Sequence, residues 1–408
     1  MKYLFIHQNF PGQFRHIAKA LAEDASNQVV AIGDLVNIRQ RPDFHHKVQL
    51  LGYQHSHQIN KNTHHYIRDY EGHIRRGQSV ARVALALKEK GFTPDVVIAH
   101  PGWGEAMFMK DIFPDAKHIN YFEYYYQGEG GDVGFDPEFP SNIDDQLKAR
   151  VKNSTQLLSL VSSTHGLSPT NWQKSRFPEE FHSKIRVIHE GINTQIIKPD
   201  ADAWIQLTNH RFSFGDEVVT YVARNLEPYR GFHSFMRSLP ILQTLRPHAH
   251  VIIVGGDDVS YGRRPKEPAT SYRSLYVNEL GNKVDWSRVH FLGKLSHNDY
   301  LKVLQISAAH VYLTYPFVLS WSMMEAMAAG CALIASDTQP VQELISDGEN
   351  GLLVNFFDSH QIAEKIASIL SDPTGFYEMR SKSRRTIVEN YDLFSKCLPE
   401  MISFITER

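Results

Sequence analysis

The 408-residue sequence has only two cysteines, Cys331 and Cys397, which excludes a small domain held together by a disulfide framework. No apolar run approaches the roughly 18–20 residues that a membrane-spanning helix needs. The first apolar run, residues 3–6, turns polar at His7, too early for the hydrophobic part of a secretory signal. An excess of one charge is lacking too, because 43 Lys and Arg stand against 45 Asp and Glu, and this argues against a nucleic-acid partner. These absences predict a soluble cytoplasmic protein in a reducing compartment.

The composition that is present, 42% apolar and 22% charged, is that of a globular protein, and the length predicts two or three domains. In the first half, short apolar runs alternate with segments whose apolar residues recur at helical spacing. The spacing predicts strands at residues 3–6, 29–32, 96–99 and 118–122 and helices from residue 14 and over 79–90. The apolar runs 157–162 and 185–189 continue the series of strands.

Residues 191–215 are rich in turn-forming residues and are predicted to be a linker. After it the alternation restarts, with strands predicted at 218–222, 251–254, 289–292, 311–314 and 332–335 and helices at 233–245, 298–307, 322–329 and 360–370. Two α/β halves in succession predict two doubly wound domains, and we place them at residues 1–198 and 199–390, followed by a C-terminal helix in 391–408. Because ligands bind beyond the carboxyl ends of such strands, we expect a cleft between the domains.

Residues 315–330 form the most informative segment, a loop that follows a strand and leads into a helix beginning near Ser322. The first N–H groups of a helix lack internal partners and favour an anion, so a diphosphate could bind the amides of Ser322 and Met323. Glu325, one turn further, could accept hydrogen bonds from a ribose. The alternative is that Ser322 and Glu325 form a capping box that only stabilises the helix.

Arg224 follows the strand predicted at 218–222, and Arg230 comes six residues later, directly before Gly231. Two guanidinium groups at the carboxyl end of a buried strand can hold a diphosphate and stabilise it as a leaving group. The alternative is a pair of ordinary surface arginines.

Gly12, in the loop Pro11-Gly12-Gln13 between the first strand and helix, would let the backbone approach a ligand closely. It is a single glycine and not the G-x-G-x-x-G of a dinucleotide site, and the sequence has no G-x-x-x-x-G-K-[ST] phosphate loop.

Two patterns suggest metal sites at first sight. Asp257 and Asp258 are adjacent after a predicted strand, and histidines pair at 45–46, 55 and 57, and 64–65. The histidines lack cysteine partners and a compact four-ligand pattern, and adjacent carboxylates in such a loop are usually solvated. We therefore predict no metal.

A set of motifs in sequence order resembles the retaining GT-B glycosyltransferases of family 4 (glycosyl transferases group 1). The matching segments are Arg224 to Gly231, VHFLGKL at 289–295, EAMAAG at 325–330, VQE at 341–343 and DGENG at 347–351. In the first half the match continues more weakly through Gly12, His100 and SPTNW at 168–172. The resemblance implies two Rossmann-like domains facing across a cleft, with the last helix crossing back to the first domain.

The resemblance also assigns donor-binding roles. It implies that Arg224 and Arg230 bind the donor diphosphate, although the family usually has Lys at the second position. Glu325 matches the second acidic residue of the E-x7-E motif, which binds the ribose. The resemblance places the base beside Lys294 and Leu295, and the donor sugar and phosphates beside Ser320, Trp321, Ser322 and Met323.

The sequence departs from the family pattern at one donor position. The first acidic residue of E-x7-E, which contacts sugar hydroxyls, is replaced by Phe317. In the first domain, His100 and Glu123 are the two candidates for a catalytic residue in the cleft. A single histidine near a strand end is often structural, and that alternative stays open.

The implied activity is transfer of a sugar, with retained configuration, from a nucleotide-diphosphate sugar to a glycan, lipid-linked or protein-linked acceptor. UDP is the expected nucleotide, and no metal or other cofactor is expected. The alternatives are a catalytically silent GT-B subunit that binds a nucleotide sugar and regulates a partner, a UDP-sugar epimerase, and a phosphorylase on the same fold.

Residues 39–76 contain seven Lys or Arg, seven His and only three acidic residues. Such a basic surface predicts contact with an anionic glycan or a lipid diphosphate, and peripheral binding at the cytoplasmic face of the inner membrane.

Overall fold

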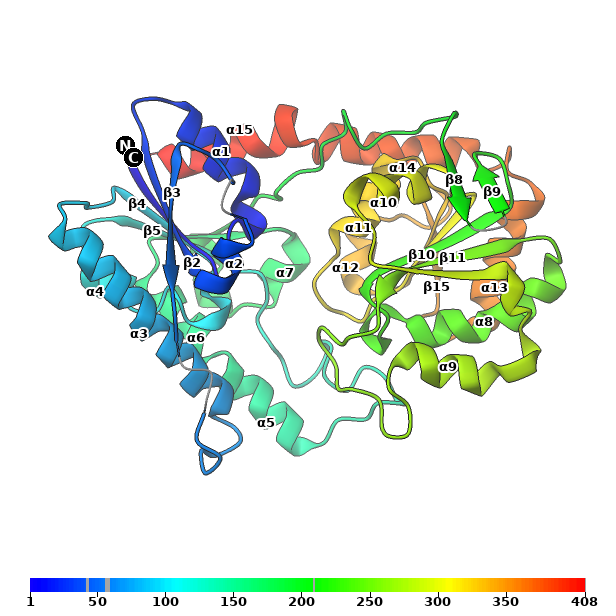
Figure 1. Cartoon of the computed structure of the whole chain (residues 1–408), viewed down its shortest axis with the longest axis horizontal. Helices are drawn as coiled ribbons and strands as arrows, with labels where there is room; N and C mark the ends of the chain where they lie inside the picture. The colour runs from blue at the N-terminus through cyan, green and yellow to red at the C-terminus, as the bar shows by residue number, and fades with distance from the viewer. Residues whose placement is uncertain (42–43, 56–58, 208–209, 408) are drawn as a thin grey trace. The chain divides into compact units, whose positions relative to one another are not determined.

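The structure is a computed structural model that describes residues 1–41, 44–55, 59–207 and 210–407. The chain forms two compact units. Unit 1 contains Met1–Gly191 and Phe394–Arg408, and unit 2 contains Ile192–Leu393. Both units are α/β (Figure 1).

Unit 1 is built on a seven-stranded parallel sheet of order β3-β2-β1-β4-β5-β6-β7. Its strands are β1 (Lys2–Ile6), β2 (Gln28–Asp34), β3 (Val48–Tyr53), β4 (Val96–Ala99), β5 (Lys117–Tyr121), β6 (His165–Ser168) and β7 (Ile185–Val187). The order reverses between β1 and β4, so the carboxyl ends of these two strands mark the switch point at which such sheets bind ligands.

Helices cover both faces of the unit 1 sheet. They are α1 (Arg15–Glu23), α2 (Leu35–Arg39), α3 (Arg68–Glu89), α4 (Met109–Ile112), α5 (Ile143–Lys152), α6 (Ser154–Ser162), α7 (Asn171–Ser175) and α15 (Leu398–Thr406). Along β1, Tyr3 and Phe5 pack toward α1 and α15, while Leu4 and Ile6 pack toward α3 and α4. Both faces are therefore buried, which explains the unbroken apolar run. The last helix of the chain lies beside α1, as the resemblance implied (Figure 1).

Unit 2 has a six-stranded parallel sheet of order β12-β11-β10-β13-β14-β15, and a separate antiparallel pair, β8 and β9. The strands are β8 (Trp204–Leu207), β9 (His210–Ser213), β10 (Val218–Asn225), β11 (His250–Gly256), β12 (Val289–Gly293), β13 (Ala309–Tyr312), β14 (Leu333–Ser336) and β15 (Leu352–Val354). Here the switch point lies between β10 and β13.

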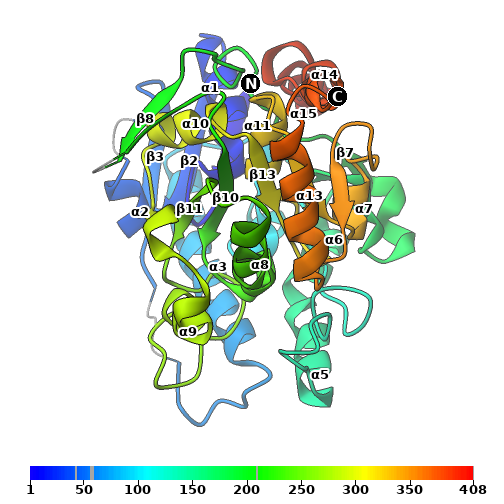
Figure 2. The same ribbon diagram turned by 90° about the vertical axis from the view of Figure 1, so that its right-hand side faces the viewer.

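The helices of unit 2 are α8 (Phe232–Leu245), α9 (Tyr272–Leu280), α10 (His297–Gln305), α11 (Trp321–Ala328), α12 (Gln339–Gln342), α13 (Ser359–Ser371) and α14 (Tyr377–Asn390). Helices α8 and α13 lie side by side in both views (Figures 1 and 2). The methionine- and alanine-rich face of α11 is buried, together with β14, in an apolar cluster of the unit.

The structure corrects three expectations about single elements. The helix expected over 79–90 begins at Arg68; the prediction was too short because the first three turns are mostly polar and carry little apolar periodicity. The apolar run 157–162 lies on α6, and the next strand is β6, since periodicity cannot separate short helices from short strands. The expected linker at 191–215 contains the hairpin formed by β8 and β9.

Candidate functional site

The two arginines of unit 2 lie close in sequence but differ in environment. Arg224 lies one residue before the end of β10 and is exposed. Arg230 is buried at the end of the short helix η4 (Pro228–Arg230). Its Nη1 donates to Thr314 Oγ1 at 2.8 Å and to the carbonyl of Val318 at 3.1 Å. Arg230 therefore fixes the loop between β13 and α11, and Arg224 offers its charge to solvent.

The N-terminus of α11 is organised around Ser320. The Ser320 hydroxyl caps the helix by accepting from the Ser322 N–H at 3.3 Å, and the Ser320 N–H donates to Tyr312 Oη at 2.9 Å. Trp321, the first helical residue, is 46% exposed. Met323 is fully buried and its N–H bonds the carbonyl of Ser320. Ser320, Trp321 and Ser322 thus lie at the open end of the helix, while the Met323 side chain belongs to the core.

Glu325 is not part of a capping box, so that alternative is wrong. Its Oε2 accepts from the Tyr300 hydroxyl at 2.7 Å, and its Oε1 lies 3.6 Å from His297 Nε2 on the neighbouring helix α10. Burial and the adjacent carboxylate raise the pKa of Tyr300 well above its usual value, so the phenol remains a donor. Tyr300 therefore orients the Glu325 carboxylate, a contact that the sequence alone does not predict.

Lys294 and Leu295 follow β12 as expected. Lys294 is exposed, and its side chain crosses Gly256, where an added Cβ would come within 2.5 Å of Lys294 Cε. Leu295 is half-buried against the cluster around Ile252 and Val254.

Phe317 lies in an aromatic cluster and not at an open polar surface. Its ring is 5.6 Å from that of Tyr229 and 4.9 Å from that of Tyr261, and the side chain is buried. The position where the family has its first acidic residue is therefore an apolar wall.

Sequence reasoning missed Glu227, between the two arginines. Its buried carboxylate accepts from the backbone N–H groups of Ser260, Tyr261 and Gly262. Glu227 thereby holds the loop after β11 beside Arg230, whose guanidinium lies 5.5 Å from the Tyr261 ring. An acidic residue flanked by two arginines was the only signal for it.

The suspected metal ligands are engaged elsewhere. Asp257 pairs with Arg273 at 2.6 Å, and Asp258 pairs with Arg264 at 3.3 Å. His45 bonds Glu23, and His57 lies outside the described residues. Within the described ranges, no group of three or more His, Cys, Asp or Glu side chains could hold a metal ion.

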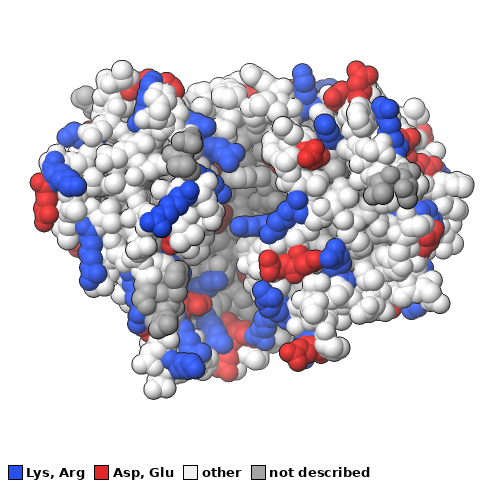
Figure 3. Space-filling view, viewed as in Figure 1, with Lys and Arg blue, Asp and Glu red and all other residues white. Residues whose placement is uncertain are grey.

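Several basic side chains of residues 39–76 are paired or hydrogen-bonded within unit 1. Lys47 pairs with Glu23, Arg75 pairs with Glu71, and Arg41 donates to backbone carbonyls. On the faces that Figure 3 shows, side chains of both signs are interspersed. No helix in the described part of the chain is long and apolar enough to cross a bilayer.

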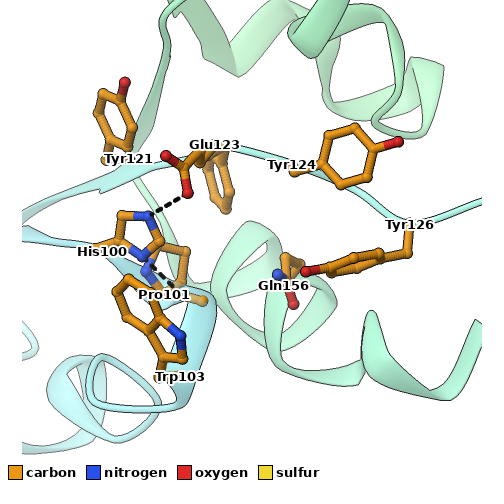
Figure 4. Close-up of a pocket in the computed structure, with 10 residues that line it drawn as sticks. His100, Pro101, Trp103, Tyr121, Glu123, Tyr124, Tyr126 and Gln156 are labelled. Atoms are coloured by element: carbon orange, nitrogen blue, oxygen red, sulfur yellow. Dashed lines mark hydrogen bonds and ion pairs between the residues drawn. The ribbon is translucent and has the colours of Figure 1, made fainter. Parts of the chain in front are cut away.

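In unit 1, the structure brings His100 and Glu123 together at the switch point. His100 directly follows β4 and Glu123 lies two residues after β5, with His100 Nε2 3.4 Å from Glu123 Oε2 (Figure 4). Gln13 Nε2 donates to Glu123 Oε1 at 2.9 Å, and Gln13 Oε1 lies 2.7 Å from His7 Nε2. The side chains of His7, Gln13, His100 and Glu123 thus form one polar network. They come from three strand ends and from η1 (Gly12–Phe14).

Backbone contacts fix the tautomers of the two histidines in this network. The Asn9 N–H donates to His7 Nδ1 and the Gly102 N–H donates to His100 Nδ1, so both rings carry their proton on Nε2. Burial, with His100 nearby, lowers the pKa of His7 to about 3, so His7 stays neutral. Burial raises the pKa of Glu123, but the facing imidazoles and the Gln13 amide outweigh it, and the net pKa lies below the usual value. The network therefore presents the ionised carboxylate of Glu123 beside the ring N–H of His100.

The structure gives Gly12 a local role beside His7. Its φ is +47°, and an added Cβ would collide with the His7 ring. The glycine lets the loop close over His7, a residue that sequence reasoning missed although it directly follows the first strand.

Comparisons with known proteins agree with this architecture. Residues 25–197 match the family model "Glycosyl transferase family 4 group", and residues 206–390 match "Glycosyl transferases group 1". D-inositol 3-phosphate glycosyltransferase of Corynebacterium glutamicum is 26% identical over 218 residues, covering 52% of this chain and 48% of that protein. GDP-mannose-dependent alpha-(1-6)-phosphatidylinositol monomannoside mannosyltransferase of Mycolicibacterium smegmatis is 24% identical over 251 residues, covering 59% and 60%. The chain thus spans about half the length of the curated relatives it matches.

Among solved structures, Anabaena HepE in complex with UDP superposes over 100% of both chains with a TM-score of 0.69 and 16% identity. Two Rossmann-like parallel-sheet units in one chain define the GT-B class. Within that class, the chain belongs to the glycosyl transferases of group 1 and family 4, which confirms the predicted family and fold class.

Proposed function

We propose that the chain is a glycosyltransferase whose unit 2 binds a nucleotide-diphosphate sugar. One observation carries the proposal: the exposed Arg224 and the open end of α11 flank the switch point between β10 and β13, with the oriented Glu325 one turn further. A cation, a helix N-terminus and an oriented carboxylate at a switch point suit the diphosphate and ribose of such a donor.

The proposed chemistry follows from where charge develops. Breaking the bond between the anomeric carbon and phosphate leaves negative charge on the diphosphate and positive charge on the sugar ring. Arg224, the buried Arg230 and the N-terminus of α11 stabilise the diphosphate. The acceptor hydroxyl attacks from the face that the phosphate leaves, and the departing phosphate takes its proton, so configuration is retained.

For the donor we propose a UDP-sugar. The support is the likeness in fold to HepE, which was solved with UDP. The mannosyltransferase relative is named for GDP-mannose, so GDP is the competing base.

In unit 1 we propose that His100 and Glu123 act beside the acceptor hydroxyl and the reacting sugar. Their support is the ionised carboxylate and the ring N–H at the β1–β4 switch point. The acceptor is a glycan, glycolipid or glycoprotein glycan. We further propose that residues 39–76 meet an anionic membrane surface, which charge-dependent co-sedimentation with anionic liposomes would support and its absence would refute.

A second candidate, a catalytically silent subunit, is favoured by Phe317, which removes the acidic residue that contacts donor sugar hydroxyls. Binding and turnover separate the two. A silent subunit binds UDP-sugars without consuming them, whereas the proposed enzyme also releases UDP.

The test is a thermal-shift panel of UDP, GDP and ADP and their sugars, followed by UDP release in the presence of glycan acceptors. We expect UDP to raise Tm most, because a ligand that binds only the native state stabilises it. We also expect UDP release to survive EDTA. Loss of activity with EDTA and its recovery with a divalent ion would contradict metal independence.

A further inference from the structure

A small pocket of about 60 Å³ opens in unit 1 beside His100, at the carboxyl ends of β4 and β5. Trp103, Tyr124 and Tyr126 contribute aromatic walls (Figure 4). Figure 4 shows Gln156, from α6, and Tyr126 across the pocket from His100 and Trp103. A few polar groups among aromatic walls are the usual composition of a small-molecule site.

Two buried polar atoms of this pocket have no hydrogen-bond partner among the described residues. Gln156 is 6% exposed, and within the described residues its Oε1 accepts no hydrogen bond. His100 is 3% exposed, and its Nε2–H makes no hydrogen bond within the same residues, although Glu123 Oε2 lies 3.4 Å away. A buried polar atom without a hydrogen-bond partner destabilises the fold. The His100 N–H therefore offers a donor to a ligand, and Gln156 Oε1 and the Glu123 carboxylate offer two acceptors.

The charge of the pocket limits the ligand. Among the described residues that line it, Glu123 is the only acidic side chain and none is Lys or Arg. The nearby Lys152 ammonium lies 3.8 Å from the centre of the Tyr126 ring and is engaged there. Because the lowered pKa of Glu123 keeps it ionised, a phosphate or carboxylate here would meet a negative charge with no cation to balance it.

The volume limits the ligand further. An apolar cavity that admits a benzene ring measures about 150 Å³. A pocket of about 60 Å³ therefore holds one edge of a ring, such as a hydroxymethyl group or two neighbouring hydroxyls, and not a whole sugar.

We propose that this pocket is an acceptor subsite that takes the neutral, hydroxylated edge of a saccharide or polyol ring. A hydroxyl donates to Gln156 Oε1 and another to Glu123, while His100 Nε2–H donates to a hydroxyl oxygen, and the apolar face of the ring lies on the aromatic walls. The inference rests on the proposed function and adds the chemistry of the group that accepts the sugar.

The test uses saturation-transfer NMR on the full chain with methyl glucoside, methyl mannoside, methyl galactoside and glucose 6-phosphate. We expect at least one neutral glycoside to bind at least tenfold more tightly than the phosphate. Gln156→Leu, which keeps the size but removes the acceptor, should weaken that binding at least tenfold. The exposed Gln195→Leu is the matched control and should bind as the wild type does.

UDP affinity, measured on the same samples, separates this proposal from the previous one. If UDP fails to bind while the glycoside binds, the proposed function is contradicted and the proposal of a saccharide-binding pocket is supported. The pocket proposal is overturned if no neutral glycoside binds, if the phosphate binds as well, or if Gln156→Leu binds like the wild type. The comparison of neutral and phosphorylated ligands uses the wild-type chain, so it holds even if the variant does not fold.

Discussion

In the proposed function, recognition of the donor ribose depends on Glu325. Its carboxylate is held by Tyr300, so Glu325→Gln should remove the charged acceptor and keep the side chain's size. A hydrogen bond to a charged group contributes about 1.5–3 kcal/mol, so we expect UDP affinity to fall at least tenfold with little change in Tm. Isothermal titration measures this, with Glu364→Gln, an exposed site on α13, as the control. Wild-type affinity in Glu325→Gln would contradict the assignment.

Arg224 is expected to act on phosphate and not on the nucleoside. Arg224→Ala should therefore lower affinity for UDP at least tenfold while leaving affinity for uridine unchanged, because only UDP carries the diphosphate. Arg385→Ala, which removes an exposed arginine of α14, is the matched control. An equal loss for both ligands would mean that Arg224 supports the fold of the site and does not bind phosphate.

Some site residues could be predicted from the sequence and others could not. Arg224 and Glu325 stand in local motifs whose spacing carries the prediction. Tyr300 lies 25 residues before its partner Glu325, and Gln13 lies 110 residues before Glu123. Such partners are set by sheet order, which local spacing does not reveal.

At the scale of elements, Gly231 joins η4 to α8 in a conformation that requires glycine. Its φ is +65°, and a Cβ there would collide with Leu313. Gly293 has the same φ, but nothing lies within 4 Å of its Cβ position. The left-handed conformation alone costs an L-residue about 1–2 kcal/mol. We therefore expect Gly231→Ala to destabilise unit 2 clearly more than Gly293→Ala in urea unfolding, and equal losses would contradict the packing at Leu313.

The strands buried on both faces could be predicted, because a short continuous apolar run such as that of β1 has few structural interpretations other than a buried strand. The helices were less certain at their ends. The first turns of α3 are polar and carry no apolar stripe, and the apolar run on α6 is too short to show a period. The hairpin of β8 and β9 has half-exposed strands of four residues, which resemble a loop in composition.

For the whole molecule, buried neutral histidines predict acid sensitivity. Burial lowers the pKa of His7 and His310 to about 3 and of His73 and His189 to about 4, against 6.5 when unfolded. Since the unfolded chain binds these protons first, the free energy of unfolding falls as pH drops below 6.5, by about 1.4 kcal/mol per histidine at pH 5.5.

Three of these four histidines lie in unit 1, so unit 1 should lose stability faster than unit 2 between pH 7.5 and 5.5. Hydrogen exchange followed by mass spectrometry resolves the two units. His7→Gln should reduce the pH dependence of unit 1, whereas the exposed His360→Gln should not change that of unit 2. Stability that is flat over this range would contradict the neutral, buried state of these rings.

The most direct test of the account is a crystal structure of the chain with UDP. The account predicts the diphosphate within hydrogen-bonding distance of the Arg224 guanidinium and the N-terminus of α11, with the ribose hydroxyls on the Glu325 carboxylate. A nucleotide bound at any other place on the chain, with Arg224 and Glu325 untouched, would contradict it.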